Sequence, residues 1–564
     1  RLNHVDPSNS LLVRKPVGDV PHRGGTRFSR DSRLHETLVK WIEQGALLDP
    51  DQKVEVERVS ITPERFVMEP GMKHRLQLIA HYTDGSTRDV TRLGIFTVNT
   101  EGVAEVTEGG EVTAREYGES AVVARYERKF AASRLIVLKQ NPGFQPTPVP
   151  TDHFIDQHVI TKLNDLKVTP SDVAGDEEFL RRVHLDLIGL QPTPDEIRKF
   201  VADTNPAKRL AEIDVLFARP EFVDHWSLKW GDLFQNSRVR LSEQAVYGFR
   251  EWLRSAIASN MPMDEFARQL LASRGGASDD PASAYFTISK DTNDTVERVA
   301  QVFCGVRMLC ARCHPHPMEN WTQADYYGMH TFFNQVSSKT DTRLTGVPNA
   351  RSVVLQLGAG FSTNPRTGQP QPPRYLGGGE PTLSAETDRR PDFARWLTTK
   401  ENPHFARSLS NRVWSYFFSR GIIDPVDDLR TTNPPINPEL LEALTKDFVD
   451  HGFDLRHLMR TIVTSRTYQR SSTPNESNRI DSMNFSRSIP RRVTAEALLD
   501  SLVQATGVRE NFGGAPGGFN AAAVAVDSKI AVPKFKHVGL RGAEDKGLQA
   551  GGFAGGFDGF DKMR

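Results

Sequence analysis

The hydrophobic pattern of the chain changes at one proline-rich stretch, and this change constrains the fold more than any other feature. Residues 54–139 contain short runs in which apolar and polar residues alternate, separated by turn signals such as Asp84-Gly85. Such alternation is typical of half-buried β-strands. After residue 152 the apolar residues recur at helical spacing instead. The sequence therefore predicts a multidomain protein in which a small all-β sandwich precedes mainly α-helical domains.

The expected domains follow from these boundaries, because 564 residues are too many for one core at roughly 100–200 residues per domain. Residues 1–48 contain a single amphipathic helix without a local partner, which suggests the remnant of a domain that begins upstream. The remaining segments are a β-sandwich at 54–139, a stiff linker with four prolines at 140–152, helical domains at 153–338 and 391–508, an irregular connection at 339–390 and a Gly-rich segment at 509–564. Within the first helical domain we expect one helix to run from about 292 to 310.

Composition excludes several classes of protein. Lys plus Arg and Asp plus Glu both number 71, so the net charge is zero and nucleic acid is not an expected partner. No apolar run approaches the ~20 residues that a membrane span needs. The three cysteines lie within one ten-residue window, which excludes a disulfide scaffold.

That window contains the motif with the clearest chemistry, Cys310-Ala311-Arg312-Cys313-His314. This Cys-x-x-Cys-His spacing is the attachment pattern of a c-type haem. Residues i, i+3 and i+4 share one face of a helical turn, so both thiols can form thioethers with the haem vinyl groups while His314 ligates the iron. The sequence predicts haem c, held by Cys310, Cys313 and His314.

Two alternatives stay open at the motif. Cys310, Cys313, His314 and His316 could together hold zinc, although adjacent residues rarely reach the same tetrahedral centre. The two thiols could also close a disulfide. If haem is bound, the candidate sixth iron ligands close after the motif are Met318, Met329 and His330, and more distant ones are His184 and His225.

Several segments resemble known families. Tyr82–Thr87, Asp89–Thr91 and Gly110–Ala114 resemble recurring motifs of bacterial immunoglobulin-like domains. Residues 179–193 and 300–333 resemble the cytochrome c-like domain family of exported planctomycete proteins, and residues 391–508 resemble the uncharacterised domain that accompanies it. The N-terminal stretches Pro21–Gly25 and Trp41–Ala46 are similar to the tail of a second cytochrome c-like domain, whose own haem motif would lie upstream.

The resemblance implies an exported protein of the periplasm or extracellular cell envelope. It implies electron transfer with a redox partner protein or with a second haem domain upstream. The alternative is a structural or polysaccharide-binding envelope protein with zinc or a disulfide at the motif. Whether the chain is an enzyme stays open, because no set of residues assembles a hydrolase site and Asp427-Asp428 is more typical of a turn or cap than of an acid–base pair.

Overall fold

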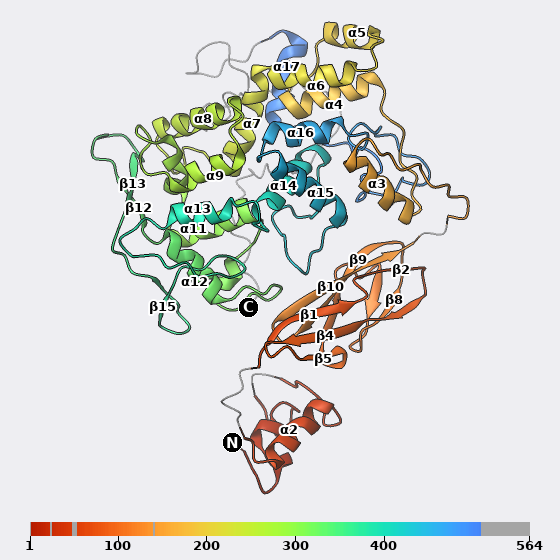
Figure 1. The fold of residues 1–564 in the computed structure, drawn as a ribbon, viewed down its shortest axis with the longest axis vertical. Helices are drawn as coiled ribbons and strands as arrows, with labels where there is room; N and C mark the ends of the chain where they lie inside the picture. The colour runs from red at the N-terminus through yellow and green to blue at the C-terminus, as the bar shows by residue number, and fades with distance from the viewer. Residues whose placement is uncertain (1, 23–24, 48–53, 139–140, 509–564) are drawn as a thin grey trace, which may run out of the picture.

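The computed structural model describes residues 2–22, 25–47, 54–138 and 141–508. A small N-terminal helical segment, a β-rich region and a large helical body follow one another along the longest axis (Figure 1). The N-terminal segment contains the 3₁₀-helix η1 (Pro7–Asn9), α1 (Leu11–Arg14) and α2 (Arg33–Glu43). Helix α2 is the amphipathic helix that the sequence predicts, and the Ser32 side chain caps it by accepting a hydrogen bond from the His35 N–H.

The β-rich region consists of ten strands in three sheets, and the order of pairing is β1-β4-β5, β2-β10-β9-β6 and β3-β8-β7. Strands β2 and β10 pair in parallel and all other pairs in this region are antiparallel. The alternating residues of these strands enclose a separate hydrophobic core. The bounds are β1 Val56–Thr62, β2 Arg65–Met68, β3 Lys73–Arg75, β4 Gln77–Tyr82, β5 Thr87–Asp89, β6 Ile95–Val98, β7 Ala104–Val106, β8 Glu111–Ala114, β9 Gly118–Tyr126 and β10 Lys129–Val137, with the 3₁₀-helix η2 at Thr91–Leu93.

The helical body begins at residue 154, and its helices start where the sequence places capping residues. The side chains of Asn437, Asp454 and Thr494 each accept a hydrogen bond from the backbone N–H three residues later, as predicted. The bounds are α3 Phe154–Asp165, α4 Asp176–Ile188, α5 Pro194–Ala202, α6 Lys208–Ala218, α7 Pro220–Leu233, α8 Glu243–Ala258, α9 Met263–Ala272, α10 Ala284–Ile288, α11 Thr292–Val299, α12 Gln323–Phe333, α13 Arg390–Leu397, α14 Phe405–Phe418, α15 Pro438–Asp450, α16 Leu455–Thr464 and α17 Ala495–Thr506.

One continuous hydrophobic core fills the helical body. It contains buried side chains from both predicted helical domains, among them Trp226 of α7 and Phe417 of α14, whose rings lie 5.8 Å apart. Aromatic side chains of this size each bury a large apolar area. The boundary between two helical domains therefore stays a prediction.

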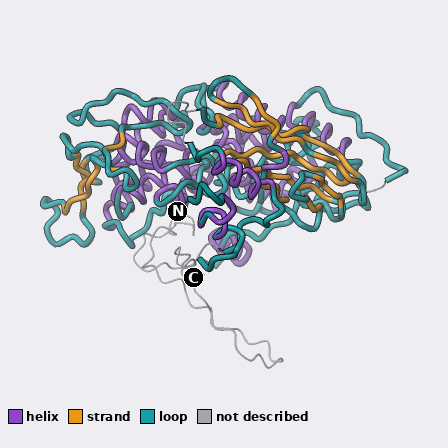
Figure 2. The backbone as a smooth tube through the Cα atoms, turned by 90° about the horizontal axis from the view of Figure 1, so that it is seen from below, coloured by secondary structure: helices purple, strands orange, loops and turns teal. Residues whose placement is uncertain are grey.

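Two segments differ from the sequence-based expectations. The helix expected at 292–310 ends at Val299, continues as a π-helical turn at Ala300–Cys304 and stops at Gly305. The connection expected to be irregular at 339–390 contains part of a hairpin formed by β12 (Val336–Thr340) and β13 (Arg351–Leu355). Figure 2 shows this small group of strands at the edge of the molecule opposite the β-rich region. The other short strands are β11 Gly275–Gly276, β14 Ser362–Thr363 and β15 Pro370–Gln371, and further 3₁₀-helices lie at Pro281–Ser283 (η3) and Leu309–Arg312 (η5).

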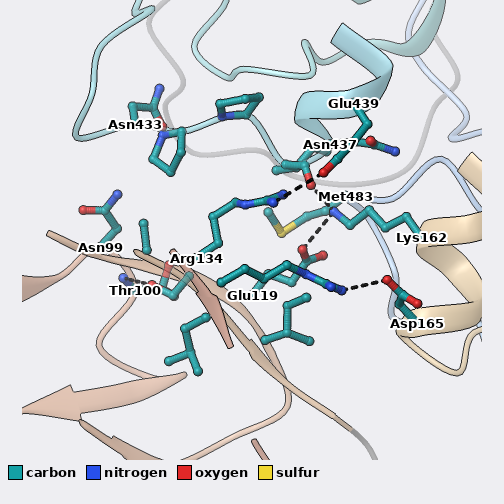
Figure 3. Close-up of a pocket in the computed structure, with 18 of the residues that line it drawn as sticks. Asn99, Thr100, Glu119, Arg134, Lys162, Asp165, Asn433, Asn437, Glu439 and Met483 are labelled. Carbon is teal, nitrogen blue, oxygen red and sulfur yellow. Dashed lines mark hydrogen bonds and ion pairs between the residues drawn. The ribbon is translucent and has the colours of Figure 1, made fainter. Parts of the chain in front are cut away.

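Charged contacts join the β-rich region to the helical body around a cavity of about 290 Å³ (Figure 3). The ammonium group of Lys162 lies 2.8 Å from the carboxylate of Glu119 on β9. Arg65 of β2 forms a second ion pair, 2.8 Å long, with Asp165 at the end of α3. The predicted linker therefore joins two regions that also contact each other directly.

Among the described residues, none of the helices combines the length and the apolar character that crossing a bilayer requires.

Candidate functional site

The Cys-x-x-Cys-His motif lies on a turn of its own, because Gly305 ends the preceding helix. Gly305 adopts a left-handed conformation with φ +66°, and a Cβ atom there would lie 2.7 Å from Cδ1 of Leu429. Glycine has no Cβ atom, so it adopts this backbone conformation without strain and also avoids the contact with Leu429. The chain then leaves the core and forms the 3₁₀-helix η5 at Leu309–Arg312.

The three motif residues share one helical turn, as their spacing predicts. The backbone N–H groups of Cys313 and His314 both donate to the carbonyl oxygen of Cys310, and both bonds are 3.3 Å long. Cys310 is half-buried and Cys313 and His314 are exposed. Both thiols are free, so the motif holds no disulfide in this structure. Cys304 lies in the core, where burial raises the pKa of its thiol, and it does not belong to the site.

The imidazole of His314 presents an uncommitted nitrogen. Its Nδ1 lies 2.9 Å from the carbonyl oxygen of Pro315. A carbonyl can only accept a hydrogen bond, so Nδ1 carries a proton, and in the neutral form of the ring the lone pair is on Nε2. The carbonyl group of Pro315 thus favours the tautomer with the proton on Nδ1, which is the tautomer that can ligate iron through Nε2.

His316 is arranged differently. Its Nδ1 accepts a hydrogen bond of 3.2 Å from the backbone N–H of Met318. Burial, together with the nearby guanidinium of Arg430, lowers the pKa of His316, which keeps the ring neutral at pH 7. A neutral ring with Nδ1 occupied carries its proton on Nε2, so no free lone pair is left for zinc.

Two of the three motif residues, Cys313 and His314, line a hollow of about 810 Å³, whereas Cys310 does not. Three guanidinium groups line it, those of Arg128, Arg312 and Arg366, and no carboxylate does. Arg128 lies between strands β9 and β10, so the β-rich region contributes to the hollow. The complete lining is Arg128, Arg312, Cys313, His314, Pro315, Gln323, Tyr327, Pro365 and Arg366.

The residues of the hollow come from three distant parts of the chain, which are Arg128, residues 312–327 and residues 365–366. The Gln323 amide of α12 donates a 3.0 Å hydrogen bond to the carbonyl oxygen of Cys313 and thereby holds the turn against the helix. Sequence reasoning did not identify Arg128 or Arg366. No spacing rule links them to the motif, because only the fold brings them to it.

The three sixth-ligand candidates close to the motif do not line the hollow. Met318 is 38% exposed and lies on the turn after the motif, whereas Met329 is fully buried in the core. His330 places Nδ1 2.7 Å from the Ser362 hydroxyl, and burial lowers its pKa to about 4. In this structure none of the three is therefore placed next to His314 in the hollow.

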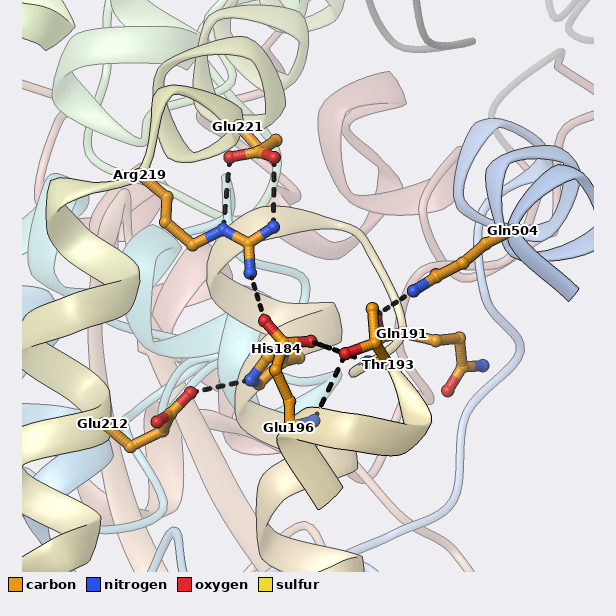
Figure 4. A network of polar contacts seen from close by, with 8 residues as sticks. All are labelled: His184, Gln191, Thr193, Glu196, Glu212, Arg219, Glu221 and Gln504. Carbon is orange, nitrogen blue, oxygen red and sulfur yellow. Dashed lines mark hydrogen bonds and ion pairs between the residues drawn. The ribbon is translucent and has the colours of Figure 1, made fainter. Parts of the chain in front are cut away.

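The two more distant histidines also lie elsewhere. His184 is buried in a polar network in which its Nε2 lies 2.9 Å from a carboxylate oxygen of Glu212 (Figure 4). The same network includes the capping box of Thr193 and Glu196, and Arg219 bridges Glu196 and Glu221. His225 lines a cavity that shares no residue with the hollow. Neither contacts the motif.

Two further predictions concern Asp427 and the zinc ligands of the motif. Asp427 forms a 2.6 Å ion pair with Arg307, and it is also hydrogen-bonded by Gln301. In the described part of the chain, the one group of three or more metal-type ligand atoms within 4.8 Å of one another is Asp447, His451 and His457. The four candidate zinc ligands of the motif are not brought together in this way.

Comparison with protein families agrees with the resemblance inferred for the helical body. Residues 154–338 match the family model described as PSCyt2, a protein of unknown function (DUF1549), and residues 389–531 match PSD1, a protein of unknown function (DUF1553). The two models thus match two consecutive segments of the chain. The Cys-x-x-Cys-His turn lies inside the PSCyt2 segment. No curated protein matches the chain. The immunoglobulin-like and planctomycete assignments stay predictions.

Proposed function

We propose that the chain is an exported c-type haem-binding protein of the cell envelope that transfers electrons. The observation that carries the proposal is the exposed Cys-x-x-Cys-His turn, with two free thiols and an available Nε2, at the mouth of a hollow lined by arginines. Each thiol would add its S–H across one vinyl group, so Cys310 and Cys313 would anchor the haem while His314 ligates the iron. Haem held there would supply one-electron chemistry.

The other lining residues fit the same group. Arg128 and Arg366 would pair with the haem carboxylates, because guanidinium and carboxylate form charge-assisted hydrogen bonds. The half-buried ring of Tyr327 also lines the hollow and would provide an apolar contact for the haem. Exposure of Cys313 and His314 places the site at the surface, where a redox partner or an upstream haem domain could approach.

The spin state of the haem tests the electron-transfer part of the proposal. None of Met318, Met329 and His330 lines the hollow. If the haem transfers electrons, one of these side chains would have to hold the iron together with His314, and the ferric spectrum should be low-spin and unchanged by carbon monoxide. A high-spin spectrum that none of Met318→Ala, Met329→Ala and His330→Ala changes would contradict electron transfer.

The test of attachment uses matched variants in a host with cytochrome c maturation machinery. The pyridine haemochrome of the purified protein should report stoichiometric haem. Cys310→Ala, Cys313→Ala and His314→Ala should each lose it, whereas Cys304→Ala, which removes a buried cysteine outside the motif, should retain it.

Zinc is distinguished by His316→Ala, which should leave haem binding intact. If the native protein instead carries stoichiometric zinc that His316→Ala abolishes, the motif is a metal site of the alternative, structural or polysaccharide-binding protein. Zinc that is lost only with His451→Ala would place the metal in the group of Asp447, His451 and His457.

A further inference from the structure

A cleft lies between the PSCyt2 and PSD1 segments and shares no lining residue with the hollow at the haem motif. It consists of two adjoining cavities of about 390 and 250 Å³. Helices α4 and α7 form one side, and α14, residues 488–494 and α17 form the other. The two cavities share His225, Lys229, Tyr416, Thr494 and Ala497. Contacts between two domains are a common place for a small-molecule site.

The larger cavity has an excess of positive charge. Its two carboxylates are already neutralised, since Glu178 forms a 2.5 Å ion pair with Arg182 and Asp186 forms one with Arg491. Three further cations line the same cavity, which are Arg181, Lys229 and Arg492. Within the described ranges none of these three forms a salt bridge. In a chain of zero net charge, this local excess is not a property of the composition.

Lys229 and His225 lie at the junction of the two cavities. The Lys229 ammonium lies 5.2 Å from the ring centroid of Tyr416 and 5.8 Å from that of Trp226, and burial lowers its pKa. The carboxylates of Asp232 and Glu496 act in the opposite direction and raise this pKa, although neither forms a salt bridge with the ammonium group in the described residues.

His225 offers a polar atom without a partner. Its Nε2 is buried and has no hydrogen-bond partner in the described structure. The His225 ring packs closely against the backbone of Gly189, where a Cβ atom would lie 2.5 Å from Nδ1. Burial and the nearby Lys229 keep the pKa of His225 well below its usual range. The ring is therefore neutral at pH 7 and contributes a hydrogen bond rather than a charge.

We propose that this cleft binds a small molecule through an oxyanion, a carboxylate, sulfate or phosphate group held by Arg181, Arg492 and Lys229. Guanidinium groups match the oxygens of such anions with two parallel hydrogen bonds. Four carboxylates line the adjoining cavity, those of Glu221, Asp232, Glu496 and Asp500, so the rest of the ligand carries hydroxyl or amino donors and not a second anion. The site is independent of the haem proposal.

The test is titration calorimetry on the full chain with sodium phosphate, sodium sulfate and sodium gluconate, at constant ionic strength. Gluconate carries a carboxylate and several hydroxyl groups, so it separates binding of the bare anion from binding of a hydroxylated anion. The variants are Arg181→Ala, Arg492→Ala and their combination. Both side chains are exposed, so their removal should leave the fold intact. The control is Arg198→Ala, an exposed arginine of α5 that pairs with Asp195.

We expect at least one of the three anions to bind, and each single variant to weaken it by about tenfold or more, the usual loss for one charge-assisted hydrogen bond. Gluconate should bind more tightly than phosphate or sulfate, and Arg198→Ala should bind like the unaltered protein. Absence of binding by all three anions would overturn the proposal. Unchanged affinity in the double variant would also overturn it, because the anion would then bind elsewhere.

Discussion

The strongest stability prediction concerns Gly305, the residue that separates the haem motif from the preceding helix. Gly305→Ala forces a side chain into a left-handed conformation, which costs about 1–2 kcal/mol. The new Cβ would also lie 2.7 Å from Leu429 Cδ1 and 3.0 Å from Ser408 Oγ. Overpacking of this kind costs about 1–3 kcal/mol. The free energy of unfolding should therefore fall by about 2–5 kcal/mol.

Two variants separate these contributions. Gly452 has nearly the same backbone angle, φ +67°, but a Cβ there would meet nothing within 4 Å. Gly452→Ala should therefore cost only the backbone penalty of about 1–2 kcal/mol. In a Leu429→Ala background most of the contact is gone, so Gly305→Ala should again cost about 1–2 kcal/mol, and the two substitutions should not be additive.

Urea unfolding followed by tryptophan fluorescence measures these differences in the helical body. Six of the seven tryptophans lie between residues 226 and 414, and none lies between 54 and 138. If Gly305→Ala lowers the free energy of unfolding no more than Gly452→Ala does, the chain near Leu429 moves to make room for the new side chain. The account of why the helix ends there would then be wrong.

Three further predictions follow from buried charges. Glu119→Gln leaves the 12%-exposed Lys162 side chain without its ion-pair partner, so the free energy of unfolding in urea should fall by about 3 kcal/mol. Adding Lys162→Met should recover much of this loss. A Glu119→Gln variant as stable as the unaltered protein would contradict the prediction. Asp156→Asn should cost about 2–4 kcal/mol, because the buried carboxylate accepts hydrogen bonds from the backbone N–H and the hydroxyl of Thr467; an unchanged midpoint would refute this role. Burial raises the pKa of Glu319 to about 7, so the folded protein holds this proton more tightly than the unfolded chain does. Stability should fall by about 3 kcal/mol between pH 4 and pH 8 relative to Glu319→Gln, and parallel pH profiles would disprove it.

Most helices of the body could be predicted because local signals and tertiary packing agree. The predicted stripe of Phe179, Leu180, Val183 and Leu187 is buried on α4, and Gly189 ends that helix in a left-handed conformation. The Cys-x-x-Cys-His turn also forms where the spacing places it, because one helical turn is a local structure.

What the sequence did not reveal depends on contacts between distant residues. The helix expected to reach residue 310 stops at Gly305, because Leu429 packs against this position from another part of the chain. The hollow unites the motif with Arg128 and Arg366 only after folding. The charge excess around Arg181 and Arg492 could not be predicted either, since it depends on which neighbours form ion pairs.

The central claim is that the motif carries covalent haem, and mass spectrometry under denaturing conditions tests it most directly. The protein should be exported in a host that matures c-type cytochromes, then denatured and digested, and the fragment that contains residues 310–314 should be weighed. The account predicts that this fragment retains the mass of one haem after denaturation, and that Cys310→Ala/Cys313→Ala abolishes it. A fragment with two free thiols, or with a disulfide and no haem, would contradict the account.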